Sequence, residues 1–244
     1  MIAIIRQEVR KVTGRRGSFW SAVGITLALV LTAYVVSIIV YQVQDDATSG
    51  EEALFLYSTL LFVPLVVFVL VASQAGAWDF ANGTFRYMVV TGRSKPQLLA
   101  LTALGVIVTS LAVTAPYCIA GLVQAYTFPL AGSDPASAKD VAQFLWFAFA
   151  QVTFWSIVAF SVGALMRSSG AGIAVAMVLY FGGFTFGGLL GAWSDTLRQI
   201  LPNFAITTTT GITDDPLGLG IVASAAWLVL FAGAALLRTA RSEY

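Results

Sequence analysis

Long apolar runs alternate with short polar segments along this chain. Six runs reach the length of about 20 residues that an α-helix needs to cross the hydrocarbon core of a membrane. They cover residues 19–41, 53–76, 98–128, 141–166, 170–193 and 217–237. A helix satisfies its backbone polar groups internally, as hydrocarbon requires. The pattern therefore predicts an all-α membrane protein, with six transmembrane helices within residues 18–244.

Two prolines fall inside these apolar runs. The third run is the longest, so we expect its helix to tilt, to kink at Pro116 or to extend beyond the membrane. Pro64 offers a similar kink in the second run. Neighbouring helices commonly satisfy the backbone groups that such prolines leave free. We therefore interpret both prolines as tolerated bends.

The first 17 residues predict a separate amphipathic helix. Its apolar stripe consists of Ile2, Ile5, Val9 and Val12, at helical spacing. Its basic residues include Arg6, Arg10 and Lys11. Such a helix lies in the membrane interface, with its basic side toward anionic headgroups or a partner protein. The alternative is a positively charged anchor that only orients the first span.

Charge and composition give the class of protein and its orientation. The chain is 58% hydrophobic and only 10% charged, whereas a soluble domain carries roughly 25% charged residues. All of the thirteen basic residues except Lys139 and Arg198 fall on the side of the two termini. Basic residues concentrate on the cytoplasmic side of membrane proteins, so we expect both termini in the cytoplasm. Arginine outnumbers lysine ten to three, which favours a GC-rich bacterial genome, so we expect a bacterial cytoplasmic membrane.

Several kinds of chemistry are missing from the sequence. The chain has no histidine, a single cysteine (Cys118) and no phosphate-binding loop of the G-x-x-x-x-G-K-[ST] type. The six runs also contain no Asp, Glu, Lys or Arg, the residues that mark proton relays and ion paths. We therefore expect a protein that is not an enzyme and holds no cofactor or metal of its own. If it drives transport, the energy comes from another subunit.

The polar segment 77–97 predicts a short helix between the second and third spans. Asp79 can cap its start, and Gly92 suits the left-handed position after its end. Ser94 and Gln97 then form a capping box that begins the third span. The short helix would expose aromatic residues, Met and Arg, which protein interfaces favour. These residues are Phe80, Phe85, Arg86, Tyr87 and Met88. The alternative is that they rest among lipid headgroups.

Residues 191–215 form the longest segment on the opposite side. Trp193, Leu197, Ile200 and Leu201 have the spacing of a short amphipathic helix, which Pro202 and Asn203 would end. The alternative is a plain interfacial loop.

Small and aromatic residues distinguish the spans themselves. Gly183, Gly187 and Gly191 make a ridge that allows close helix contact, either between two copies of the chain or within one. Aromatic side chains are abundant, so a translocation path here would suit hydrophobic or amphipathic cargo. The sequence does not single out a substrate site.

One stretch resembles a known family. Asp79-x-x-x-Gly83-Thr84-x-Arg86, followed by residues 92–95 and the pair Leu98-Leu99, is similar to the acid-x-x-x-Gly-Thr stretch of ABC-2 type permeases. The six spans and the amphipathic start agree with that family. The chain departs from it in having aspartate in place of the usual glutamate, and Leu101-Thr102 where a lysine is common.

The resemblance implies the membrane subunit of an ATP-driven exporter of drugs, antimicrobial peptides or lipids. The segment Asp79, Phe80, Gly83, Thr84, Phe85, Arg86 and Tyr87 would be a coupling helix that docks on a separate ATP-binding subunit. Residues 1–17 would be the elbow helix, and residues 191–215 would fold back into the outer leaflet. The complex would hold two permease copies and two ATPases, with ATP and Mg bound by the latter, and no nucleic acid. A membrane scaffold or sensor that transports nothing is the alternative function.

Overall fold

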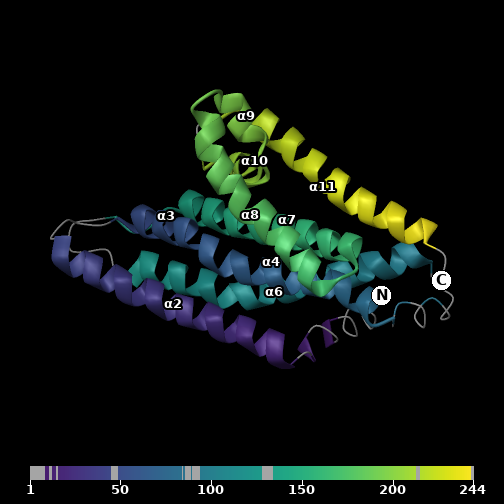
Figure 1. The fold of residues 1–244 in the computed structure, drawn as a ribbon. Coiled ribbons are helices and arrows are strands. Elements are labelled where there is room, and N and C mark those ends of the chain that lie inside the picture. Colours follow the sequence, from purple (N-terminus) through teal and green to yellow (C-terminus); the bar gives the residue numbers. More distant parts are fainter. Residues whose placement is uncertain are drawn as a thin grey trace.

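The structure, a computed structural model, describes residues 9–10, 13–14, 16–44, 49–83, 85, 89, 94–127, 134–212 and 215–242. All regular elements among these residues are helices, arranged as one elongated bundle (Figure 1). They are α2 (Arg16–Gln44), α3 (Gly50–Leu60), α4 (Phe62–Ala81), α6 (Lys95–Thr127), α7 (Ala138–Met166), α8 (Ser169–Gly191), α9 (Asp195–Ile200), α10 (Pro202–Thr209) and α11 (Leu217–Arg241).

Five helical segments are long and apolar enough to cross a membrane. They are Gly50–Ala81, Lys95–Thr127, Ala138–Met166, Ser169–Gly191 and Leu217–Arg241, and they contain most of the last five predicted spans. The described apolar part of α2, Val23–Val36, is shorter. The protein is therefore an all-α protein of the multi-pass membrane type.

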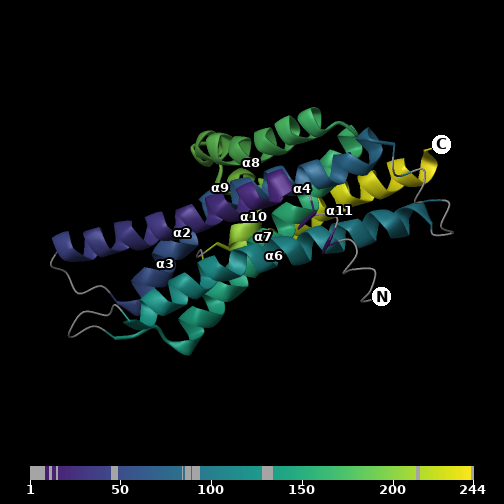
Figure 2. The same ribbon diagram turned by 90° about the horizontal axis from the view of Figure 1, so that it is seen from below.

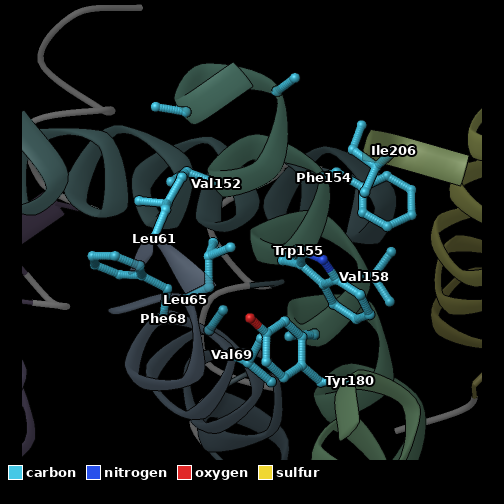
Figure 3. Packing of buried hydrophobic residues seen from close by; sticks show 14 of the residues in the cluster. Leu61, Leu65, Phe68, Val69, Val152, Phe154, Trp155, Val158, Tyr180 and Ile206 are labelled. Atoms are coloured by element: carbon cyan, nitrogen blue, oxygen red, sulfur yellow. The ribbon is translucent and has the colours of Figure 1, made fainter. Parts of the chain in front are cut away.

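Helix α7 is the central helix of the bundle. It packs against α4, α6, α8 and α11. Within its most apolar stretch 67% of the residues are buried, compared with 22% in α8 and in α11. Figure 3 shows its Trp155 and Val158 facing Tyr180 of α8, with α4 beside them. The outer helices expose many apolar side chains, as expected of helices whose outer faces contact lipid.

The tightest contact in the core joins α4 to α7. A Cβ atom on Gly76 would lie 2.0 Å from the backbone oxygen of Phe160, and one on Gly163 would lie 1.9 Å from that of Ser73. Only glycine permits backbones to approach this closely. These two glycines therefore fix the spacing of the two helices.

The two prolines within the apolar runs have different effects. The helix of the second run is interrupted at one residue, Leu61, which keeps helical angles (φ −57°, ψ −24°) and lies three residues before Pro64. Proline has no N–H to donate to the carbonyl four residues earlier, and its ring clashes with that carbonyl. Here that carbonyl belongs to Leu60, the last residue of α3, which accounts for the break. Helix α6, by contrast, continues through Pro116.

Between α8 and α11 the chain forms a helical hairpin of α9 and α10. A short helix, α9, forms within the expected segment and includes Leu197 and Ile200 but neither Trp193 nor Leu201, and Pro202 begins α10 at a position where helices favour proline. Helix α10 lies inside the bundle against α7, α8 and α11, with Asn203, Ala205 and Ile206 buried. The segment is therefore a packed hairpin rather than a plain loop.

The glycine ridge of α8 faces this hairpin. A Cβ on Gly183 would lie 2.8 Å from Asn203 Nδ2, and one on Gly187 only 2.0 Å from the Phe204 ring. A Cβ on Gly191 would lie 3.2 Å from the Cδ of Arg198. Of the two packing alternatives for the ridge, the structure has the one within a single chain.

The start of α2 and the end of α11 lie at the same end of the bundle in both views (Figures 1 and 2). Helices α4 and α7 end there, and α6 and α8 begin there. We call this the basic end, because Lys95, Arg167, Arg238 and Arg241 lie in these helix ends. The hairpin α9–α10 lies toward the opposite end.

Candidate functional site

Two parts of the structure are candidates for function: the basic end of the bundle and a cavity beside the hairpin. At the basic end, Asp79 lies in the last turn of α4, so the prediction that it caps a new helix is wrong. Helix α4 continues past Asp79 to Ala81, and its end is closed by Asn82. The Asn82 backbone N–H donates to the Trp78 carbonyl at 3.0 Å, and its Nδ2 donates to the same oxygen at 2.9 Å.

Gly83 ends this helix with φ of +69°. Glycine adopts this left-handed conformation without the steric cost that other residues carry. The sequence predicted Gly92 in such a position, but Gly92 lies outside the described residues. A Cβ on Gly83 would meet nothing within 4 Å, so the described chain leaves open space beside it.

Phe80 and Phe85 lie against the bundle rather than exposed on a docking helix. Phe85 is only 3% exposed, and its ring stacks on that of Phe80 with centroids 4.5 Å apart. The Arg167 guanidinium lies over the Phe80 ring, 5.2 Å from its centroid. The expectation that both rings are exposed is thus wrong for Phe85, because Phe80 covers it. Phe85 and Val89 are helical, while Thr84, Arg86, Tyr87 and Met88 lie outside the described residues.

Side chains at the basic end also connect α6, α7 and α11. Arg238 Nη1 of α11 donates to the carbonyl of Leu165 in α7 at 2.5 Å. Lys95 Nζ, at the start of α6, donates to the backbone carbonyl of Ser242. Arg167 follows the last residue of α7 and has the left-handed conformation, with φ of 55°. Ser168 comes next, and α8 begins at Ser169. The last turn of α4 therefore contacts a connected set of helix ends.

One of the two hydrogen bonds of the predicted capping box is present at the start of α6. The Ser94 backbone N–H donates to Gln97 Oε1 at 3.3 Å, which is the bond from the third helical residue back to the cap.

The predicted elbow helix is described in part. Val9, Arg10 and Thr13 are helical, with Arg10 exposed. Thr13 Oγ1 donates to the Val9 carbonyl at 3.0 Å. Arg6 and Lys11 lie outside the described residues.

The second candidate is a cavity of about 220 Å³ between α3, α4, α7, α8 and α10, which we call the hairpin cavity. Its aromatic lining consists of Phe55, Phe62, Phe147, Trp155, Tyr180 and Phe184. Its polar lining consists of Ser58, Thr59, Gln151, Asn203 and Thr207, and Leu65 and Ile212 complete it. The lining therefore combines aromatic rings with neutral polar groups.

A chain of hydrogen bonds runs along one wall of the hairpin cavity. Gln151 Nε2 donates to Thr207 Oγ1 at 3.0 Å, and Thr207 donates to the Asn203 carbonyl at 2.8 Å. Asn203 Nδ2 donates to the Tyr180 carbonyl at 2.6 Å, and the Tyr180 hydroxyl donates to the Phe62 carbonyl at 2.8 Å. These bonds connect α7, α10, α8 and α4, so they fix the hairpin against the bundle.

Little in the sequence indicates that these residues form a group. Asn203 entered the prediction only as a helix stop, and Thr207 did not enter it. The sequence indicated only that aromatic side chains are abundant in the spans. The one local signal in the sequence was an Asn directly after a proline. If such an amide is buried, it needs hydrogen-bond partners.

Metal-ligating side chains do not gather in either candidate. Within the part of the chain that the structure describes, no three Asp, Glu or Cys side chains lie close enough to hold a metal ion.

Comparison with known proteins gives a family but not an activity. Residues 39–243 match the model of a family described as "Protein of unknown function (DUF2705)". A search of curated proteins found no match. The matched range contains both candidate sites and covers most of the chain. The protein is therefore a member of the DUF2705 family.

Proposed function

We propose that this protein is the membrane subunit of an ABC exporter of the ABC-2 permease type. It would move a hydrophobic or amphipathic compound, such as a drug, an antimicrobial peptide or a lipid, with ATP hydrolysed by a separate subunit. The observation that carries the proposal is the stretch from Asp79 to Arg86 at the end of α4, with its acid-x-x-x-Gly-Thr pattern. Residues 79–83 and Phe85 of this stretch lie at the basic end of the bundle, where a cytoplasmic subunit would dock.

The contacts of this stretch suit the transmission of motion. Phe80 packs on Phe85 and under Arg167, so a force on the segment after α4 reaches the end of α7 directly. Helix α7 in turn packs against α4, α6, α8 and α11. A docked ATPase would therefore act on the whole bundle through one helix end.

The proposal includes a full topology. We propose six spans, with α2 as the first, and a bacterial cytoplasmic membrane as the location. The basic end would face the cytoplasm together with both termini, and α9–α10 would be a re-entrant hairpin in the outer leaflet. The excess of basic residues at one end supports this orientation.

The complex would contain further chains. We propose two ATP-binding subunits, which hold ATP and Mg, and a second permease copy, identical or homologous. Amphipathic residues 1–17, with Arg6, Arg10 and Lys11, would lie in the cytoplasmic interface as the elbow helix.

Co-purification tests the proposal. The chain is co-expressed with any P-loop ATPase that a neighbouring gene is found to encode, purified in detergent and assayed for bound ATPase and for ATP hydrolysis. We expect stable association and stimulated hydrolysis. Absence of an associated nucleotide-binding subunit from the intact complex would refute the proposal.

Variants at Gly83 test whether the ATP-binding subunit docks at the end of α4. Gly83→Trp fills the open space beside the end of α4 with a bulky side chain, so we expect weaker association. Gly83→Asn is the matched control, because asparagine tolerates the left-handed conformation and adds little volume. The double charge reversal of Asp79 and Arg86 should also weaken association. Equal pull-down and equal ATPase stimulation in all variants would contradict the coupling role of this segment.

Transport separates the exporter from a scaffold. The complex in proteoliposomes with ATP should move an amphipathic compound across the bilayer. A partner ATPase that binds without any such movement would indicate the alternative, a membrane scaffold or sensor.

A further inference from the structure

A hollow of about 320 Å³ lies between α6, α7 and α11, and we call it the α6–α11 groove. Two alanines of α6 and two of α11 line it, together with bulkier apolar residues. The alanines are Ala100, Ala103, Ala232 and Ala235. Among the described residues of the lining, Ser161 is the one polar side chain and none is charged. The groove therefore offers a surface that suits hydrocarbon.

The two helices that carry these alanines diverge from the basic end of the bundle. The start of α6 and the end of α11 lie side by side there, and the helices separate toward the opposite end (Figures 1 and 2). Lys95 Nζ of α6 donates to the Ser242 carbonyl at the end of α11, which joins the two helices at the basic end. Small side chains commonly let membrane helices pack closely. Because α6 and α11 diverge, their alanines leave a hollow instead.

The dimensions of the groove match one acyl chain. A cavity of about 150 Å³ holds the six carbons of benzene, so this groove accommodates roughly twelve carbons of a hydrocarbon chain. Along α6 the lining extends from Leu99 to Ile107, about 12 Å at the rise of an α-helix. This length fits within one leaflet, which is half of a hydrocarbon core about 30 Å thick. A helix of a second copy, about 10 Å across, would cover the groove without filling it.

Two basic side chains lie one helical turn beyond the lining, at the basic end. Lys95 precedes Leu99 by four residues, so the two lie on the same side of α6. Arg238 follows Ala235 by three residues on α11. Arg238 Nη1 donates to the carbonyl of Leu165 at the end of α7. All three helices of the groove therefore contribute to this border.

The charge at this border is complementary to an anionic headgroup. A guanidinium has five N–H donors, and the bond to Leu165 uses one donor of Arg238, which is exposed. Asp79 is the only acidic side chain that the structure describes at the basic end. Basic pockets between transmembrane helices bind the headgroups of anionic lipids. The border therefore favours a phosphate next to the apolar groove.

We infer that the α6–α11 groove binds one anionic phospholipid, with an acyl chain between α6 and α11 and the headgroup at Arg238 and Lys95. The acyl chain fills the space that the diverging helices leave, and the headgroup connects α6 to α11 at the basic end. The lipid is retained rather than exported, so this inference goes beyond the proposed function and does not rest on it.

Two lipids that differ only in their headgroups test the charge. The full chain is purified in detergent, freed of lipid and titrated with dioleoyl phosphatidylglycerol or dioleoyl phosphatidylcholine, and bound lipid is counted by native mass spectrometry. We expect one tightly bound phosphatidylglycerol per chain. Phosphatidylcholine should bind roughly twenty-fold more weakly, the effect of two basic residues on one anionic lipid. Equal affinities of the two lipids would overturn the inference.

Two arginines of α11 distinguish this site from general surface charge. Arg238→Gln removes the charge and keeps an N–H donor, and we expect phosphatidylglycerol to bind about five-fold more weakly. Arg241→Gln is the matched control. Arg241 is exposed and follows Ala232 by nine residues, about two and a half turns, so it lies on the face of α11 opposite the lining. Equal losses in the two variants, or no loss in Arg238→Gln, would refute the headgroup site.

Two alanines of α6 test the groove itself. Ala103→Phe places a ring in the lining and should abolish tight binding of phosphatidylglycerol. Ala112→Phe is the control, because Ala112 is exposed on the same helix and does not line the groove. Unchanged binding in Ala103→Phe, or an equal loss in both variants, would place the lipid elsewhere and refute the site. If Ala103→Phe does not fold, the comparison of Arg238→Gln with Arg241→Gln decides alone.

The same spectra report the alternative occupant, a second copy of the chain. A dimer that Ala103→Phe dissociates, with phosphatidylglycerol still bound, would assign the groove to contact between copies and overturn the lipid site. The titrations contain no ATP-binding subunit. Their failure would therefore remove this inference and leave the proposed function standing, and failed co-purification would leave the lipid site standing.

Discussion

The Tyr180 hydroxyl on α8 donates a hydrogen bond of 2.8 Å to the Phe62 backbone carbonyl on α4, and the two rings stack at 5.4 Å. This pair joins α8, which leads into the hairpin, to α4, which ends at the basic end. It also forms one wall of the hairpin cavity. Packing, hydrogen bonding and the candidate binding site therefore depend on the same two residues.

Removal of this hydroxyl should weaken the bundle modestly. Tyr180→Phe keeps the ring stack and loses one hydrogen bond, which contributes about 0.5–1 kcal/mol in a membrane protein. We expect a lower thermal unfolding midpoint for the purified protein in detergent. Tyr126→Phe is the control, because Tyr126 is 53% exposed. Equal midpoints for the two variants would show that the bond does not stabilise the bundle.

Gly187→Ala should displace the hairpin. Its Cβ would lie 2.0 Å from Cε2 of Phe204, so α8 and α10 must separate or the ring must move. Overpacking of this kind costs about 1–3 kcal/mol. Gly188→Ala is the matched control, since a Cβ there meets nothing within 4 Å. Thermal unfolding of both proteins gives the comparison.

A second substitution checks the cause of that effect. Phe204→Leu in the Gly187→Ala protein shortens the side chain that the new methyl group meets, and we expect it to restore part of the stability. No recovery would mean that the loss does not come from this contact.

Gly163→Ala should be more damaging than Gly187→Ala. The new Cβ would lie 1.9 Å from the backbone oxygen of Ser73, and a backbone atom cannot move aside without separating α4 from α7. We expect a loss of about 3 kcal/mol or more, at the upper end of overpacking effects. Gly170→Ala, where a Cβ meets nothing within 4 Å, should fold normally. The yield of monodisperse protein and its unfolding midpoint are the measurements.

Single cysteines should report the orientation. In a Cys118→Ser background, Ala240→Cys lies at the basic end and Trp193→Cys beside the hairpin, where Trp193 is 88% exposed. In intact cells, a maleimide that cannot cross membranes should label Trp193→Cys only. Permeabilised cells should label both. Labelling of Ala240→Cys in intact cells would contradict cytoplasmic termini.

The helices were predictable from sequence because they depend on local apolar length. The fifth run, 170–193, became α8 at Ser169–Gly191, and the sixth, 217–237, became α11 at Leu217–Arg241. Hydrocarbon thickness sets such lengths without any knowledge of neighbours. The break before Pro64 was also predictable, because proline acts on its own helix.

The end of α4 was not predictable to the residue. Asp79 is a good helix cap in isolation, but capping preference is weak against a helix that continues in contact with α7. Gly83 and Gly92 both suit the left-handed position after a helix, and sequence alone does not rank them. Phe85 is buried beside Phe80, and Phe80 in turn lies under Arg167, which is far along the chain.

The hairpin cavity was not predictable from the sequence for a related reason. Asn203 in its wall donates to the carbonyl of Tyr180, 23 residues earlier, and groups of α7 and α4 complete the lining. The glycine ridge predicted a close contact, yet spacing on one helix does not name the partner. The partner proved to be Asn203 and Phe204 of the same chain.

The connection between α7 and α8 constrains how the bundle can move. Only Arg167 and Ser168 separate the two helices, so the first turn of α8 cannot leave the last turn of α7. Helix α8 is therefore tied to α7 at its first turn, at the basic end, while its last turn leads into the hairpin. A rotation of α8 at Arg167, next to Phe80, would therefore move α9 and α10 farther than the first turn of α8, because the helix is 23 residues long.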